Sequence, residues 1–165
     1  MRTPNLFIVG APKCGTTSLD NYLRQHPDVF MSPKKEPHYF GSDLYAPRFI
    51  RDWETYRVLF SGATDEAVVG EASVWYLYSQ NAAREIHSVC PNAKIIIMLR
   101  NPVDQMHSLH SQRLYSGLET IRDFEDALAA EADRKRGQRI PPHAHPVEGL
   151  FYGDVASYAY QVERY

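Results

Sequence analysis

Residues that can bind an anion are concentrated in one short loop near the amino terminus. The apolar run Leu6–Val9 leads into this loop, which contains two glycines, a proline, a lysine and three hydroxyl residues. Its sequence is Gly10-Ala11-Pro12-Lys13-Cys14-Gly15-Thr16-Thr17-Ser18. A turn between a buried strand and a helix directs backbone N–H groups and the positive end of the helix dipole at a bound anion. The pattern therefore predicts a phosphate-binding loop, in which Lys13 supplies a mobile positive charge.

The position of the lysine separates this loop from the P-loop of ATP- and GTP-hydrolysing proteins. Gly10 and Gly15 have the spacing of the two P-loop glycines, but Thr16 stands where the lysine would follow. The lysine lies inside the loop instead, at Lys13. This displacement favours a phosphate-bearing donor other than ATP. The alternative interpretation is a tight structural turn with a lysine in solvent.

A second group of candidate residues follows the strongest predicted strand, Lys94–Leu99. Arg100 ends this strand, and Ser108 lies about two helical turns into the helix that begins near Pro102. Ligands of open parallel sheets bind beyond the carboxyl ends of the strands, where P-loop hydrolases usually place a magnesium-binding aspartate. An arginine at this position favours a second phosphate over a metal ion. A surface ion pair of Arg100 is the alternative.

Together the two motifs resemble those of sulfotransferases that use 3′-phosphoadenosine 5′-phosphosulfate (PAPS) as the donor. Pro12–Leu19 resembles their 5′-phosphosulfate loop, and Arg100-Asn101-Pro102 with Ser108 resembles their 3′-phosphate motif. The likeness runs from about Asn5 to Arg113. Two further segments are similar to bacterial proteins related to heparan-sulfate sulfotransferase domains: Lys35–Phe40 and Gly70–Ser73.

The resemblance implies transfer of a sulfuryl group to a hydroxyl acceptor, with 3′-phosphoadenosine 5′-phosphate as the product and no metal. Lys13 would stabilise charge on the oxygen that bridges phosphate and sulfur. Arg100 and Ser108 would hold the 3′-phosphate, which ATP lacks. The donor-binding residues that the resemblance implies are Pro12, Lys13, Cys14, Gly15, Thr16, Thr17, Ser18, Arg100 and Ser108.

The resemblance also assigns the general base to Glu36. An alcohol must lose its proton as the new S–O bond forms, and a carboxylate near lysines stays ionised, which is the form required. His38 is a second catalytic candidate, which would orient Glu36 or the acceptor. The alternative is that Glu36 pairs on the surface with Lys34 or Lys35.

Alternating strands and helices predict the elements that position these residues. The predicted strands are 6–9, 67–71 and 94–99. Their alternation with helices favours a P-loop-like α/β fold of three layers, α/β/α, with a central parallel sheet. Residues 1–165 are expected to form one sulfotransferase-like domain, supplying the amino-terminal and central part of the full fold.

Two helices carry the clearest periodicity after the loop. The first is predicted from Ala46 to Phe60, with a packed face of Phe49, Trp53, Tyr56 and Phe60. The second begins near Pro102, with an inner face of Val103, Met106, His110 and Leu114. A further helix is expected from Asp123, which is a plausible cap, to about Lys135.

Composition excludes several classes of protein. Of the 165 residues, 44% are hydrophobic and 23% charged, as in ordinary globular domains, and the net charge of −2 gives no reason to expect nucleic acid or an anionic membrane as a partner. The two cysteines, Cys14 and Cys90, fit reduced thiols and are too few for a metal site. Without an apolar run of signal or spanning length, no membrane insertion and a cytoplasmic location are expected. The oligomeric state stays open.

The chain departs from the family pattern in several places. Ala72, Val74 and Gln105 replace the lysine, proline and arginine common in related sequences. A later strand and a closing loop of the family have no counterpart up to Tyr165, so an incomplete fold and donor site are expected. The alternative functions are an ATP-dependent P-loop kinase and a nucleotide-binding fragment without turnover. The expected acceptor is a hydroxyl group of a carbohydrate, a lipid or a small molecule, and the sequence leaves open which of these it is.

Overall fold

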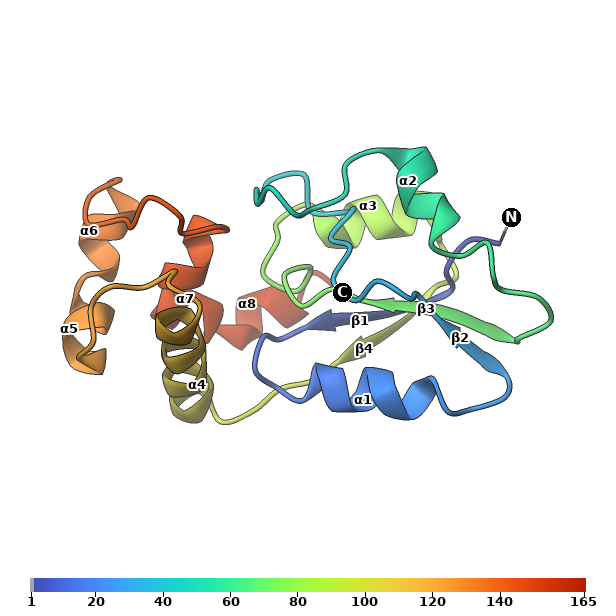
Figure 1. The fold of residues 1–165 in the computed structure, drawn as a ribbon, viewed down its shortest axis with the longest axis horizontal. Helices are drawn as coiled ribbons and strands as arrows, with labels where there is room; N and C mark the ends of the chain where they lie inside the picture. Colours follow the sequence, from blue (N-terminus) through green and yellow to red (C-terminus); the bar gives the residue numbers. More distant parts are fainter. Residues whose placement is uncertain (1) are drawn as a thin grey trace.

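A parallel β-sheet of four strands forms the centre of the structure, a computed structural model that describes residues 2–165 (Figure 1). The strand order is β2-β3-β1-β4. The strands are β1 (Leu6–Gly10), β2 (Val29–Met31), β3 (Val68–Ala72) and β4 (Lys94–Ile97). Every residue of β1 is buried because the strand lies between β3 and β4, which explains its apolar sequence. The predicted α/β fold with a central parallel sheet is confirmed.

Strand β2 is the strand that the sequence pattern does not predict. It is three residues long and pairs with β3, Val29 lying opposite Val68 and Met31 opposite Gly70. Three residues are too few for a recognisable alternation of apolar and polar side chains. The segment that follows this strand carries Glu36, the predicted general base.

Helices cover both faces of the sheet and complete the predicted three layers (Figure 1). Helix α1 (Thr16–Leu23) lies on one face, and α2 (Trp53–Val58) and α3 (Ala82–Val89) lie on the other.

Successive residues of β1 point into opposite layers, as the pleat of a strand requires. Ile8 packs in the cluster that includes Leu19 of α1, and Phe7 packs in the cluster that includes Tyr56 of α2 and Ile86 of α3. Strand β1 therefore contributes side chains to the hydrophobic core on each face of the sheet.

The remaining helices gather beyond the carboxyl ends of the strands (Figure 1). They are α4 (Pro102–Tyr115), α5 (Phe124–Ala129), α6 (Glu131–Lys135), the 3₁₀ helix η1 (Val147–Leu150), α7 (Tyr152–Val155) and α8 (Tyr158–Val162). Asp123 caps α5 as predicted, because its carboxylate accepts the N–H of Asp126. Across residues 2–165, no helix has the length and apolar character needed to span a membrane.

The helix predicted from Ala46 to Phe60 is wrong in extent. Only Trp53–Val58 is helical, and Asp52 caps it by accepting the N–H of Thr55. Phe49 lies in the irregular segment before the helix, where its ring packs 4.4 Å from the ring of His38. Its apolar character therefore comes from packing beside His38, and the helical spacing is incidental.

The predicted inner face of α4 is wrong in part: His110 is buried and Met106 packs against a buried cluster, as predicted, but Val103 is not part of that face. Val103 is 55% exposed, and the buried residues of this helix are Gln105, Leu109, His110 and Arg113. Most of these side chains are polar because they bind the backbone of neighbouring loops. Gln105 donates to the Pro12 carbonyl at 3.2 Å, and Arg113 donates to the Pro146 carbonyl at 3.2 Å.

A buried ion pair holds the helices beyond the sheet together. The Arg134 guanidinium of α6 donates to Glu119 at 2.8 Å, and both side chains are fully buried. The Tyr152 hydroxyl of α7 donates to the other carboxylate oxygen of Glu119 at 2.8 Å, and Arg134 also donates to the Leu150 carbonyl at 3.3 Å. Glu119 thereby joins the α4–α5 connection to α6 and α7.

Replacing Glu119 with alanine is expected to lower the free energy of unfolding by about 3–5 kcal/mol, because the buried Arg134 charge would lose its partner. Urea-induced unfolding measures the change. The control is Glu54→Ala, which removes an exposed carboxylate that pairs with Arg57 on α2 and should change the stability little. Equal effects of the two substitutions would contradict a structural role for the buried pair.

Candidate functional site

The predicted phosphate loop connects β1 to α1, and two left-handed residues give it its curvature. Lys13 and Gly15 have φ angles of 65° and 84°. Gly15 precedes α1 without supplying a side-chain cap, so the first N–H groups of the helix stay available to a ligand. Thr16 and Thr17 add hydroxyl groups in the same turn. This arrangement suits an anion.

A cleft of about 350 Å³ lies in front of this loop at the carboxyl edge of the sheet. It brings together the two motifs that the sequence places far apart. Its lining residues are Pro12, Lys13, Gly15, Thr16, Thr17, Glu36, Val74, Arg100, Ser108 and Gln112. Parallel strands end at the same edge, which is why the residues after β1, β2, β3 and β4 meet here.

Three of the predicted site residues do not line this cleft. The Cys14 side chain is buried 3.9 Å from the Tyr158 hydroxyl, and burial raises the pKa of its thiol. Ser18 is exposed on α1. His38 lies behind Glu36, covered by protein. The cleft therefore uses the backbone and threonines of the loop, not the Cys14 thiol.

The second motif is built from the end of β4 and the start of α4. Asn101 caps α4 by accepting the N–H of Val103 at 3.0 Å, and Pro102 occupies the first turn. Arg100 is an exposed side chain whose nearest carboxylate, Asp104, lies at 3.8 Å. Such a loose surface pair holds the guanidinium weakly, so a ligand in the cleft can compete for it.

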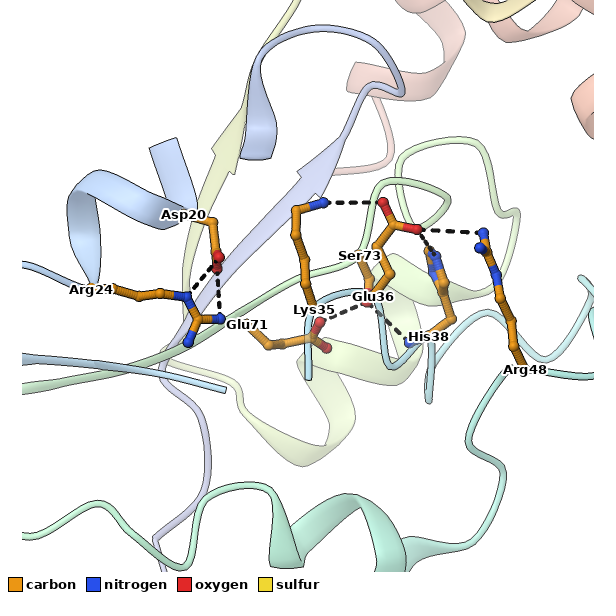
Figure 2. A network of polar contacts seen from close by, with 8 residues as sticks. All are labelled: Asp20, Arg24, Lys35, Glu36, His38, Arg48, Glu71 and Ser73. Carbon is orange, nitrogen blue, oxygen red and sulfur yellow. Dashed lines mark hydrogen bonds and ion pairs between the residues drawn. The ribbon is translucent and has the colours of Figure 1, made fainter. Parts of the chain in front are cut away.

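Glu36 reaches the cleft from the segment that follows β2 (Figure 2). Its N–H donates to the Ala72 carbonyl at 2.9 Å, and its φ angle of 59° is left-handed. The carboxylate contacts Lys35 at 3.0 Å and Arg48 at 3.4 Å. Burial alone would raise the pKa of Glu36, but His38 and Lys35 outweigh it and lower the pKa to about 2. The carboxylate is ionised at neutral pH.

His38 stands directly behind this carboxylate. Its Nε2 lies 3.7 Å from Glu36, too far for a hydrogen bond, and the side chain is 1% exposed. Neither ring nitrogen has a hydrogen-bond partner among residues 2–165. Burial lowers the pKa of His38 to about 4, against the opposing effect of Glu36. The neutral His38 imidazole thus lies behind the Glu36 carboxylate and does not face the cleft.

A second, smaller pocket of about 100 Å³ shares part of its wall with the cleft. The shared residues are Pro12, Glu36, Val74 and Gln112. The remaining lining residues are Arg48, Trp75, Leu109, Arg113, Ser116, Leu118 and His145. Glu36 therefore lies on the boundary between two spaces, one beside the anion loop and one beside α4.

The sequence reasoning missed several residues of this site. Gln112 could have been predicted, because it lies one helical turn after Ser108 on the same face of α4. Arg48 and His145 come from irregular segments without any motif, so only the fold reveals them. Among residues 2–165, no three His, Cys, Asp or Glu side chains are grouped so as to hold a metal ion.

The three departures from the family pattern also have places in the structure. Gln105 links α4 to the phosphate loop through the Pro12 carbonyl, and its Oε1 is buried without a partner among the described residues. Val74 lines both spaces. Ala72 is buried in β3 and contributes only its carbonyl to the segment of Glu36.

Comparison with known proteins places this site in a family. Residues 3–137 match the sulfotransferase domain. The crystal structure of a sulfotransferase from Alicyclobacillus acidocaldarius superposes with a TM-score of 0.88 at 42% identity, covering 100% of this chain and 68% of that one. Heparan sulfate glucosamine 3-O-sulfotransferase 6 of Mus musculus is 36% identical over 113 residues, which are 68% of this chain and 31% of the relative.

A more distant relative is carbohydrate sulfotransferase 15 of Homo sapiens, 31% identical over 147 residues, covering 64% of this chain and 26% of the relative. The chain thus spans less than a third of the length of these curated relatives. The family match covers most of the chain and includes the loop, the Glu36 segment and the Arg100 motif. The chain belongs to the sulfotransferase domain family.

Proposed function

We propose that the chain is a single sulfotransferase-like domain that transfers a sulfuryl group from PAPS to a hydroxyl acceptor. The observation that carries this proposal is the place of Glu36. Its carboxylate lines both the cleft beside the anion loop and the smaller pocket beside α4. A donor in the cleft and a hydroxyl in the pocket would meet at this group.

The donor fits the residues of the cleft. The N–H groups of the loop, the hydroxyls of Thr16 and Thr17 and the Lys13 ammonium form a donor set for the 5′-phosphosulfate. Arg100 and Ser108, which line the same cleft, would bind the 3′-phosphate and favour PAPS over ATP. Of the other loop residues, Pro12 and Gly15 would shape the cleft, while Cys14 and Ser18 would contribute only through the backbone.

In the proposed reaction, Glu36 accepts the proton of the acceptor hydroxyl as its oxygen forms a bond to sulfur. The bond between sulfur and the bridging phosphate oxygen breaks, and its electron pair stays on that oxygen. Lys13 stabilises the charge that develops there. His38 is neutral and its ring lies behind the Glu36 carboxylate at 3.7 Å, so we assign it an orienting role.

We propose a glycan or small-molecule hydroxyl as the acceptor. The names of two relatives specify a heparan sulfate glucosamine and a carbohydrate. In this chain, the residues that line the pocket beside Glu36 include Trp75, Arg113 and Arg48, of which Arg48 is largely exposed. An apolar ring surface next to hydrogen-bond donors suits a sugar ring with its hydroxyls.

The decisive experiment measures turnover of ³⁵S-labelled PAPS by the protein in its full natural length across a panel of glycan, phenol and lipid alcohols. Transfer of label to at least one alcohol is the expected result. Binding of PAPS without transfer to any acceptor would contradict the proposal and would instead favour a nucleotide-binding domain without turnover.

Replacing Glu36 with glutamine is expected to lower the transfer rate by about 10²–10⁴-fold, because the amide cannot accept the proton. Binding of 3′-phosphoadenosine 5′-phosphate, measured by calorimetry, should remain unchanged. Glu54→Gln is the matched control, since it removes an exposed carboxylate of α2 outside the cleft. A Glu36→Gln variant with the wild-type rate would remove Glu36 from its proposed role.

Replacing Arg100 with alanine is expected to weaken binding of 3′-phosphoadenosine 5′-phosphate by about 10- to 100-fold, the value of a charged hydrogen bond. Binding of adenosine 5′-phosphate, which lacks the 3′-phosphate, should change little. Arg84→Ala, which removes an exposed arginine of α3, serves as the control. Equal weakening of both nucleotides by Arg100→Ala would show that Arg100 does not recognise the 3′-phosphate.

A further inference from the structure

Glu71 is a buried carboxylate that the proposed reaction does not use. It lies in β3 with 0% exposure, and none of the ion pairs found among residues 2–165 includes it. Burial raises its pKa to about 7, despite the hydrogen bonds that it accepts. A carboxyl group in a core costs folding free energy that an apolar side chain would not. Such a residue calls for a function.

All of the hydrogen bonds that the Glu71 carboxylate accepts come from hydroxyl groups. Ser73 donates to one carboxylate oxygen at 2.7 Å. Tyr76 and Tyr56 donate to the other, at 2.7 Å and 3.1 Å. A hydroxyl has a single hydrogen. When that hydrogen is donated to Glu71, the lone pairs of the hydroxyl oxygen point away from the carboxylate and can accept a hydrogen bond from another group.

Those lone pairs hold the segment that carries the proposed base (Figure 2). The His38 N–H donates to the Ser73 hydroxyl at 3.0 Å. The Phe40 N–H donates to the Tyr76 hydroxyl at 3.3 Å. Glu71 therefore fixes two backbone N–H groups, each through one hydroxyl, at positions two and four residues after Glu36.

The segment needs this support because its backbone is strained. Glu36 and His38 have φ angles of 59° and 50°, a left-handed conformation that costs about 1–2 kcal/mol for each residue other than glycine. Carbonyls at the end of this segment are also held, since Arg51 donates to those of Tyr39 at 2.9 Å and Gly41 at 3.1 Å. A conformation of this kind persists only where its surroundings fix it.

We propose that Glu71, acting through the hydroxyls of Ser73 and Tyr76, is a positioning residue that sets the Glu36 carboxylate on the boundary between cleft and pocket. The proposal rests on the function proposed above. Glu71 touches neither space, so its effect on the reaction passes through the backbone of residues 36–40.

Replacing Ser73 with alanine removes one link of this network with the smallest change in volume. It leaves the His38 N–H without its acceptor. Displacement of the base by a fraction of an ångström is expected to lower kcat by about 10- to 100-fold. The KM for PAPS and the affinity for 3′-phosphoadenosine 5′-phosphate should stay unchanged, because the loop and Arg100 are untouched.

Ser79→Ala is the matched control. Ser79 is equally buried, and its hydroxyl also bonds a carboxylate, that of Asp43, while accepting the N–H groups of Asn81 and Ala82. Those groups belong to the start of α3, outside the site. Ser79→Ala should lower the thermal midpoint without lowering kcat. Equal losses of kcat in the two variants, or no loss in Ser73→Ala, would overturn the proposal.

A second measurement tests the positioning without any acceptor. In the wild type, burial lowers the pKa of the His38 ring to about 4. In Ser73→Ala, the pKa of His38, followed by proton NMR, should move towards its ordinary value of about 6.5, and in Ser79→Ala it should not. If no alcohol accepts the sulfuryl group, this titration still decides whether Ser73 holds the segment, and an unmoved His38 overturns the proposal.

The tyrosines supply a second pair of variants should Ser73→Ala fail to fold. Tyr76→Phe removes the acceptor of the Phe40 N–H and should lower kcat and shift the His38 titration. Tyr56→Phe removes a donor to Glu71 that binds no N–H group of the segment, so kcat should fall less. The reverse order of effects would contradict positioning through the backbone.

Discussion

The site depends on hydrogen bonds between β3 and the residues that follow β2. These bonds continue the pairing of the two strands beyond Met31, the last residue of β2. The Ser32 N–H donates to the Gly70 carbonyl at 2.8 Å, and the Glu36 N–H donates to the Ala72 carbonyl at 2.9 Å. Residues 33–35 loop out between these two contacts. Because β3 also pairs with β1, the segment of Glu36 is set at the same edge of the sheet as the anion loop.

The second requirement is electrostatic. The chain has a net charge of −2, so an anion site must come from local placement of cations. Lys13 and Arg100 line the cleft, while Lys35 and Arg48 contact the Glu36 carboxylate. Close to the carboxylate, His38 and Lys35 outweigh the effect of burial and keep Glu36 ionised, with a pKa of about 2. The proposed base thus remains negative beside a loop suited to anions.

The sequence predicts those parts of the structure whose causes are local. A buried strand, a glycine-containing loop and a hydroxyl-rich helix start follow one another directly in the sequence. Patterns of this kind predict the family, the three layers and the strands β1, β3 and β4. Strand β2 is too short to show a recognisable sequence pattern. The face of α4 is misread because Gln105 and Arg113 are buried to bind loop carbonyls, which apolar periodicity cannot show. The smaller pocket, with Arg48 in its wall, forms only when distant segments meet. The roles assigned to individual site residues therefore remain predictions.

Calorimetric titration of the protein with 3′-phosphoadenosine 5′-phosphate and, separately, with ATP and magnesium tests the central claim most directly. The displaced lysine and the arginine after β4 both bear on which nucleotide the cleft selects. Tighter binding of 3′-phosphoadenosine 5′-phosphate, without a need for magnesium, is the predicted result. Tighter binding of ATP with magnesium would contradict the assignment of the cleft as a phosphosulfate donor site.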